Sequence, residues 1–156
     1  MFRRLASSVL VAGLACGCSS PSEPDAPGGI RDAPTSVTLE GATLVLQATL
    51  WRDYQQISPP DGKPLAAVLR VKTADGSVFP PKVAADMVWV FNGEAVWSPA
   101  FEVVASGPAS SWLELAMRDG PKWGPGITVD VIVRLRDSAG APHLLQARAQ
   151  PIVRTN

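Results

Sequence analysis

Hydrophobic and polar residues alternate along most of the chain after residue 34, which is the pattern of strands with one buried face. The clearest stretch is 128–136, where valine or leucine stands at every odd position from 129 to 135. Only Ile132 interrupts the polar positions between them. Residues 43–51 and 65–73 repeat the pattern. Further strands are predicted at residues 87–91, 94–97, 112–118 and 143–150, and weaker ones at 37–40 and 101–105.

Turn signals separate these stretches. Asn92-Gly93 stands between two apolar runs, which predicts a hairpin, and Asp75-Gly76 and residues 137–140 mark two more reversals. No stretch of helical length shows a 3.6-residue period without a proline or glycine. We therefore predict an all-β fold of seven to nine strands, an immunoglobulin-like or fibronectin III-like two-sheet sandwich, with a small β-barrel as the alternative.

The first residues have the form of an export signal. Arg3 and Arg4 precede an apolar run over residues 5–15, which is shorter than the roughly 20 residues of a membrane-spanning helix. Cys16 and Cys18 follow it directly and are the only cysteines in the chain. The arginine pair lacks the neighbours that a twin-arginine export signal needs.

The sequence Gly17-Cys18-Ser19-Ser20 resembles the lipobox of bacterial lipoproteins, in which a small residue precedes the cysteine that is acylated. We favour Cys18 as the lipidated residue. Cys16, which follows Ala15, is the alternative. The motif prefers leucine at positions where this chain has Gly13 or Ala15, and a plain signal peptide with incidental cysteines is the competing interpretation.

The resemblance implies a signal peptide over residues 1–17 and a membrane anchor at the new N-terminus. No acidic residue follows the cysteine, which implies the outer membrane, with the domain facing the periplasm or the cell surface. Residues 18–34 are rich in proline, serine and glycine and contain one large apolar residue, Ile30, so we expect a tether that packs against nothing. The folded domain is predicted at residues 35–156.

Composition and charge narrow the classes of possible binding partner. Apolar residues make up 46% of the chain and charged residues 18%, which suits a packed core. The 14 basic residues balance the 14 acidic ones, and loss of Arg3 and Arg4 with the signal leaves a charge of −2. We therefore expect no nucleic-acid partner.

The residues that usually carry catalysis or bind metals are sparse. His143 is the only histidine, no Gly-x-Ser-x-Gly sequence occurs, and the acids are scattered singly. The pairs Asp119 with Asp130 and Asp53 with Asp61 are the only candidates for a carboxylate pair, and turn capping explains most of these acids equally well. We expect no metal, no cofactor and no enzymatic activity.

Five tryptophans are the most distinctive side chains. Trp89 and Phe91 share one face of a predicted strand, and we expect Trp97 to extend this stripe, either exposed for sugars or peptides or buried beneath a loop. The glycine- and proline-rich loop 119–126 presents Trp123, either as a binding anchor or as an inward cap on the core. Loop 51–63 is expected beside it. The candidate ligand contacts are Trp51, Tyr54, Trp89, Phe91, Trp97, Asp119, Lys122 and Trp123.

These observations predict a membrane-tethered, non-catalytic binding module of the bacterial cell envelope. Its partner would be an envelope protein, a peptide or a polysaccharide. The alternative is an accessory subunit of an envelope complex that docks through a sheet edge. A hydrolase is the least favoured function.

Overall fold

The structure is a computed structural model that describes residues 27–105 and 110–156. Nine strands lie within these residues, one at each stretch where the alternation predicts it, and one helical turn precedes them. The predicted all-β class is confirmed. The elements are α1 (Pro27–Ile30), β1 (Ser36–Leu39), β2 (Ala42–Asp53), β3 (Leu65–Thr73), β4 (Ala84–Asn92), β5 (Ala95–Trp97), β6 (Glu102–Ala105), β7 (Trp112–Gly120), β8 (Thr128–Arg136) and β9 (Pro142–Thr155).

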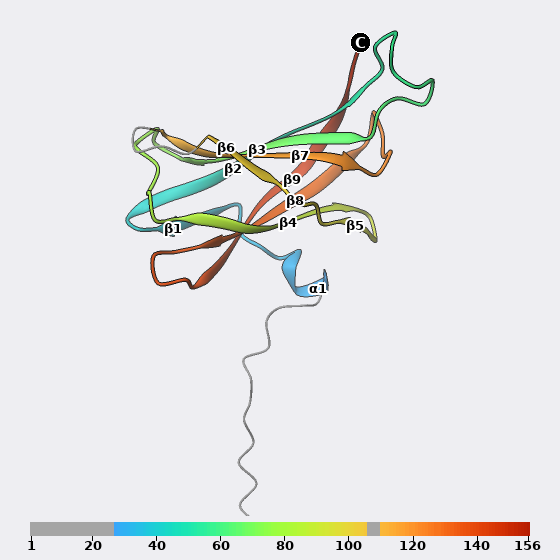
Figure 1. Ribbon diagram of the computed structural model, residues 1–156. Coiled ribbons are helices and arrows are strands. Elements are labelled where there is room, and N and C mark those ends of the chain that lie inside the picture. The colour runs from blue at the N-terminus through green and yellow to red at the C-terminus, as the bar shows by residue number, and fades with distance from the viewer. Residues whose placement is uncertain (1–26, 106–109) are drawn as a thin grey trace, which may run out of the picture.

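The strands form one curled mixed sheet (Figure 1). Their hydrogen-bonded order is β5-β4-β8-β9-β2-β3-β7-β6, and β1 pairs with β2 beside this path. All neighbours run antiparallel except β2 and β9, which run parallel from Leu50 and Ile152 onward. The curl brings the β4-β8 half beneath the β3-β7 half, so that one apolar core lies between them. Fully buried residues from both halves fill it, among them Leu44, Leu69, Val90, Val131 and Leu145.

Strand β9 joins the two halves because it pairs with a different neighbour along each part of its length. Its first part pairs with β8 from Pro142 to Pro151, with a bulge between Ala147 and Gln150, and its last part pairs with β2 from Ile152. Within this bulge Ala149 adopts a φ of 50°, and its backbone N–H donates to the Asp130 carboxylate at 2.7 Å. This left-handed residue bends the strand from one half of the sheet to the other.

The outer face of the β4-β8-β9 half is covered by residues 27–34, which we call the strap. Ile30 and Ala33 are 2% and 3% exposed and pack against Phe91 and Ile132. Burial beneath the strap explains why Ile132 interrupts the polar face of its strand. Figure 1 shows α1 below this half of the sheet, on the side away from the main core.

The strap is also tied down by polar contacts. Arg31 stacks on the Phe91 ring at 4.5 Å and donates to the Gly93 carbonyl. The Gln146 N–H donates to the Pro34 carbonyl at 2.8 Å. Our expectation that the segment up to Pro34 packs against nothing is therefore wrong for its last part. Cys16, Cys18 and the rest of residues 1–26 lie outside the described residues, where the signal peptide and the lipidation site stay predictions.

No helix in residues 27–105 or 110–156 has the length and apolar composition to cross a membrane.

Candidate functional site

The predicted aromatic stripe is not available as a surface. Phe91 is 2% exposed and Trp89 is half-buried, because the strap lies over them. Trp97 does not extend the stripe, since it pairs with Val90 and shares the inner face of that residue. Any two-residue turn around Gly93 places Trp97 opposite an even-numbered residue, and the even-numbered residues Val88 and Val90 face the core. The prediction that Trp97 extends the stripe is therefore wrong, because Trp97 lies on the opposite face of the sheet from Trp89 and Phe91.

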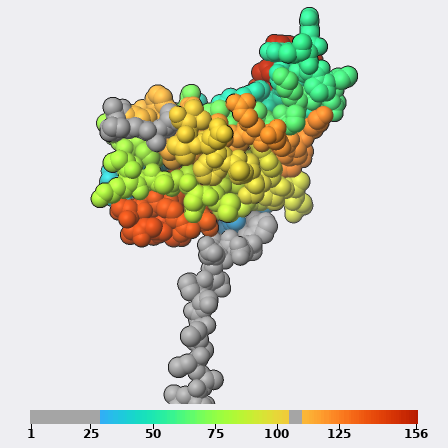
Figure 2. Space-filling model, viewed as in Figure 1, coloured from blue at the N-terminus to red at the C-terminus, as the bar shows by residue number. Residues whose placement is uncertain are grey.

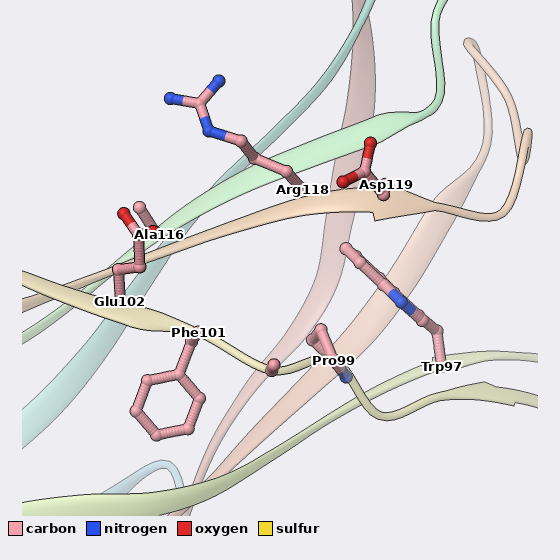
Figure 3. A pocket seen from close by; sticks show the side chains of 8 residues that line it. Trp97, Pro99, Phe101, Glu102, Ala116, Arg118 and Asp119 are labelled. Carbon is pink, nitrogen blue, oxygen red and sulfur yellow. The ribbon is translucent and has the colours of Figure 1, made fainter.

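Trp97 instead closes one end of the core beside β7. A Cβ atom at Gly120 would lie 2.8 Å from the Trp97 ring, so the ring occupies the space that a side chain at Gly120 would need. In Figure 3 the Trp97 ring points toward the end of β7, whereas Arg118 points to the other side of that strand. Asp119, between Arg118 and Gly120, has a φ of 59°, a conformation that aspartate tolerates better than most residues.

Loop 119–126 turns its tryptophan inward. Trp123 is half-buried and packs against the main core together with Ile127. The neighbouring Lys122 points outward and forms an ion pair with Asp61 of loop 54–63. The hydrogen bond from Lys122 lowers the pKa of the Asp61 carboxyl. Of the two predicted positions of Trp123, the structure therefore has the inward cap, while Lys122 links the two loops.

Arg52 holds these two loops together from inside. Its side chain is 3% exposed and donates to four backbone carbonyls. Two belong to loop 54–63, those of Asp61 and Lys63, and two to the other loop, those of Lys122 and Gly124. The expected proximity of the loops is confirmed. The buried Arg52 side chain that links them, which we call the staple, was not predicted.

Tyr54 belongs to the same end of the molecule. Two guanidinium groups lie near its ring, with Arg154 at 4.4 Å and Arg52 at 5.2 Å from the ring centre. A Cβ atom at Gly62 would lie 2.6 Å from a Tyr54 ring carbon, so glycine is required beneath the ring. Figure 2 shows this loop projecting beside the C-terminal residues. Tyr54 thus packs within the loop, and Ile57, which is 86% exposed, lies farther along it.

The opposite outer face, on β2, β3 and β7, carries a row of three adjoining hollows that we call the outer groove. The first, of 470 Å³, lies between β7 and the segment 97–102 and includes Trp97, Phe101, Glu102 and Arg118. The second, of 210 Å³, shares Arg118 and Asp119 with the first and contains Trp51, Asp53 and Lys63. The third, of 330 Å³, shares Trp51 with the second and is lined also by Gln47, Thr49, Val68, Arg70 and Glu114.

Aromatic and polar side chains alternate along this groove. Trp51 is half-buried at its centre. Near its far end Trp112 is 38% exposed, and Arg70 lies 5.6 Å above its ring while pairing with Glu114 at 2.5 Å. Arg118 forms no ion pair with another residue of the described ranges. The groove therefore brings together two predicted contacts on the outer face, Trp51 and Asp119, whereas Trp97 borders the first hollow from the core side of β7.

The predicted contacts fall into three groups in the structure. Trp89 and Phe91 lie beneath the strap, and Tyr54, Lys122 and Trp123 build the loop end. The third group, Trp51, Trp97 and Asp119, lines the hollows of the outer groove. Arg118, which sequence reasoning missed, lies between the first and second hollows of the groove. Its signal was available, because residues 112–118 alternate and Arg118 shares its parity with Trp112 and Glu114 on the polar face.

Several acids and the histidine have structural partners. Asp53 pairs with Lys63 at 3.0 Å, and His143 lies beside Asp137 with 2.8 Å between Nε2 and Oδ2. The hydrogen bond from His143 lowers the pKa of Asp137. Among the described residues no three metal-ligating side chains come close enough together to hold an ion.

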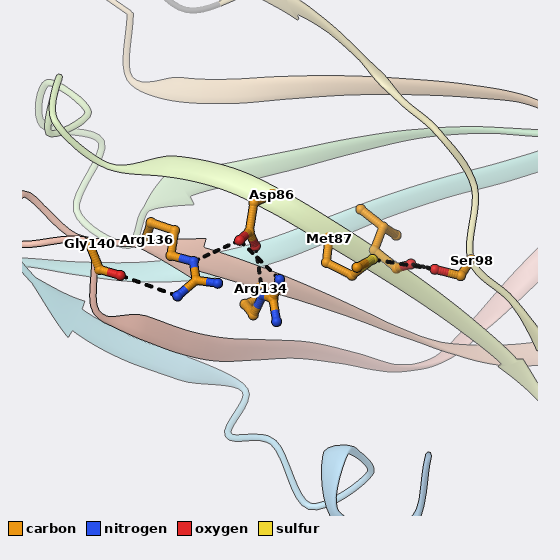
Figure 4. A network of polar contacts seen from close by, with 7 residues as sticks. Asp86, Met87, Ser98, Arg134, Arg136 and Gly140 are labelled. Atoms are coloured by element: carbon orange, nitrogen blue, oxygen red, sulfur yellow. Dashed lines mark hydrogen bonds and ion pairs between the residues drawn. The ribbon is translucent and has the colours of Figure 1, made fainter. Parts of the chain in front are cut away.

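One further polar cluster lies on the strap side of the sheet and ties β4 to β8 (Figure 4). The Asp86 carboxylate accepts hydrogen bonds from Arg134 at 2.8 and 3.0 Å and from Arg136 at 2.7 Å. Burial raises the pKa of Asp86, but the two guanidinium groups outweigh it, and the pKa is lowered overall. Arg134 also lies over the Trp89 ring, at 6.0 Å.

Comparison with known proteins adds no relative. No protein-family model, no curated protein and no solved structure matches the chain.

Proposed function

We propose that the protein is a lipid-anchored, non-catalytic binding module of the bacterial cell envelope, and that the outer groove is its recognition surface. The anchor rests on the lipobox-like sequence at Cys18, with Cys16 as the alternative. The non-catalytic role rests on the sparse catalytic residue types of the sequence, and two of the four acids of the groove, Asp53 and Glu114, are already paired with cations.

We further propose that the domain is a sandwich of the immunoglobulin type. The order of its strands supports this. One half runs β2-β3-β7-β6 and the other β4-β8-β9, which correspond to the orders ABED and CFG of such domains. The continuous core between the halves supports it as well.

The observation that carries the binding function is the contrast between the two outer faces. The strap covers Phe91 and Ile132 on one face, so the chain itself occupies that apolar surface. The other face has no such cover in residues 27–105 and 110–156, and its hollows gather Trp51, Arg118 and Asp119. Concave sites with a few convergent polar groups are where proteins bind ligands.

The anchor is tested by replacing Cys16 and Cys18 with serine and fractionating the cells. We expect the protein to move from the membrane to the soluble fraction. If the variant stays with the membranes, the lipid anchor is wrong.

The recognition surface is tested with the same serine variant, mixed with isolated envelopes of the host and sedimented. We expect it to sediment with them, and Trp51→Ala to reduce the bound fraction at least about tenfold. Trp89→Ala is the matched control, because its ring lies on the strap side. Equal losses in the two variants would contradict the assignment of the outer groove.

A second function, an accessory subunit that docks through a sheet edge, has one specific observation in its favour. The edge strand β6 exposes Val103 and Val104, at 53% and 57%. Exposed edges of this kind accept a strand from another chain. If Val103→Lys abolishes envelope binding while Trp51→Ala leaves it intact, this second function is the correct one.

A further inference from the structure

We infer that the outer groove binds a neutral glycan chain several sugar units long. This inference rests on the proposed function and names the ligand class of the same site. Four properties of the groove lead to it: its length, its source of hydrogen bonds, its charge and its aromatic rings.

The groove is too long for a compact ligand. Along β3, Ala66 lines the second hollow and Arg70 lines the third. These two points are four residues apart, which is roughly 13 Å along a strand. Across the sheet the hollows extend from Glu102 of β6 to Gln47 of β2, so a ligand that fills them is extended and crosses the strands obliquely.

The groups in the groove that are free to form hydrogen bonds with a ligand belong to side chains. Strand β3 runs along the floor and is paired on both sides, with β2 and with β7, so its backbone groups are occupied. An extended peptide binds most strongly where a free edge accepts its backbone, and the floor of the groove has no such edge. Thr49, Arg70 and Arg118 instead offer hydroxyl and guanidinium groups, which suit the hydroxyls of a sugar.

The charge of the groove favours a neutral ligand. Three basic side chains, Lys63, Arg70 and Arg118, stand against four acidic ones, Asp53, Glu102, Glu114 and Asp119. Two ion pairs, Lys63 with Asp53 and Arg70 with Glu114, neutralise most of this charge locally. A strongly charged polymer would have to disrupt these pairs, whereas neutral hydroxyls can add to them.

The indole rings supply the apolar part of the contact. Trp51 is shared by the second and third hollows, so a ring stacked on it is also within reach of polar groups on both sides. A flat aromatic surface bordered by hydrogen-bonding side chains complements a sugar, which has an apolar face and a polar rim. We assign the main stacking contact to Trp51, and hydrogen bonding to adjacent hydroxyls to Arg118.

The test is calorimetric titration of the detergent-solubilised full chain. The neutral probes are chitohexaose, cellohexaose, laminarihexaose and maltohexaose, and the charged ones are hexagalacturonate and the chitosan hexamer. We expect at least one neutral probe to bind with a Kd between about 10 μM and 1 mM, and neither charged probe to bind more tightly. Trp51→Ala should weaken binding at least about tenfold and Arg118→Gln about threefold to tenfold, while Trp89→Ala leaves the Kd unchanged.

Three results would overturn the inference. They are tighter binding of a charged probe, no binding of any neutral probe at about 5 mM, and equal effects of Trp51→Ala and Trp89→Ala. Arg118→Gln keeps the test usable if Trp51→Ala does not fold, because Arg118 lies outside the main core. Envelope sedimentation that depends on Trp51 but is lost after protease treatment of the envelopes would reject the glycan and retain the proposed binding module. If neither glycan binding nor Trp51-dependent sedimentation is observed, both the glycan ligand and the proposed binding module are rejected.

Discussion

Arg52 Nη1 donates a hydrogen bond to the carbonyl oxygen of Gly124 at 2.8 Å, across 72 positions of the chain. The same guanidinium reaches loop 54–63 through Lys63, so one buried cation satisfies backbone oxygens of two loops. Buried carbonyls without a donor destabilise a fold, which gives this single residue control over one end of the domain.

Arg52→Met should lower the free energy of unfolding by about 2 to 4 kcal/mol, because it leaves four carbonyls without their donor. Arg52→Lys should recover only part of this, since an ammonium group cannot reproduce the planar fork. Urea titration measures both. Arg154→Met is the matched control, because Arg154 is exposed and stacks on the same Tyr54 ring. A comparable loss in the control would contradict the role of the staple.

Trp123→Ala should lower the melting temperature by more than about 8 °C, because its ring packs against the core. Trp112→Ala removes the same side chain from an exposed position and should change the melting temperature by less than about 2 °C. Calorimetry measures the two variants side by side, and equally small shifts in both would contradict the inward cap at Trp123.

Ile30→Asp should release the strap without unfolding the domain. The expected loss is about 1 to 3 kcal/mol, since the cost cannot exceed the free energy that docks the strap on Phe91 and Ile132. The readouts are a red shift of tryptophan fluorescence from Trp89 and binding of a hydrophobic dye. Ile57→Asp, at an 86% exposed position, should produce neither change. Complete unfolding of Ile30→Asp would show instead that the strap belongs to the core.

Asp86→Asn should destabilise the protein by roughly 1 kcal/mol at pH 7. The two arginines lower the pKa of Asp86 in the folded state below its ordinary value of 3.8, so the ionised carboxylate stabilises the fold above that value. This contribution is lost as the pH falls through the lowered pKa. The difference between the variant and the unchanged protein should therefore be constant above about pH 5 and should vanish in acid. Glu94→Gln, on the exposed β4–β5 turn, gives the background for the same measurement.

The strands were predictable because burial on one face imposes a period of two, and residues 65–73 and 128–136 form strands with the predicted bounds. The strap was not, because Ile30 is a single apolar residue among prolines and glycines, and no local pattern reports where it packs. Ile132, which the strap covers, did leave a signal in the sequence. Ile132, an apolar residue on a polar face, indicated that something covers that face.

The candidate site was predicted less well, for the same physical reason. Trp51 and Asp119 lie in one groove only because β2 and β7 flank β3, and strand order is not written in any single stretch of sequence. The prediction placed Arg52 in loop 51–63, but it lies in β2 and its side chain is buried. A charged residue at a strand end suggests exposure. Continuing the even-numbered face of β2 beyond Leu50 would have placed Arg52 toward the core.

Because β2 pairs in parallel with β9, the sheet cannot be completed before β9 is available. Thr155 Oγ1 donates to the Arg52 carbonyl, 103 positions earlier, so the first long strand waits for the last one. A chain threaded through a membrane with its N-terminus first cannot complete this pairing until its final residues have emerged. If the protein is exported as we propose, residues 50–53 of β2 therefore remain an open edge during export, and a chaperone that binds extended segments would have its target there until β9 emerges.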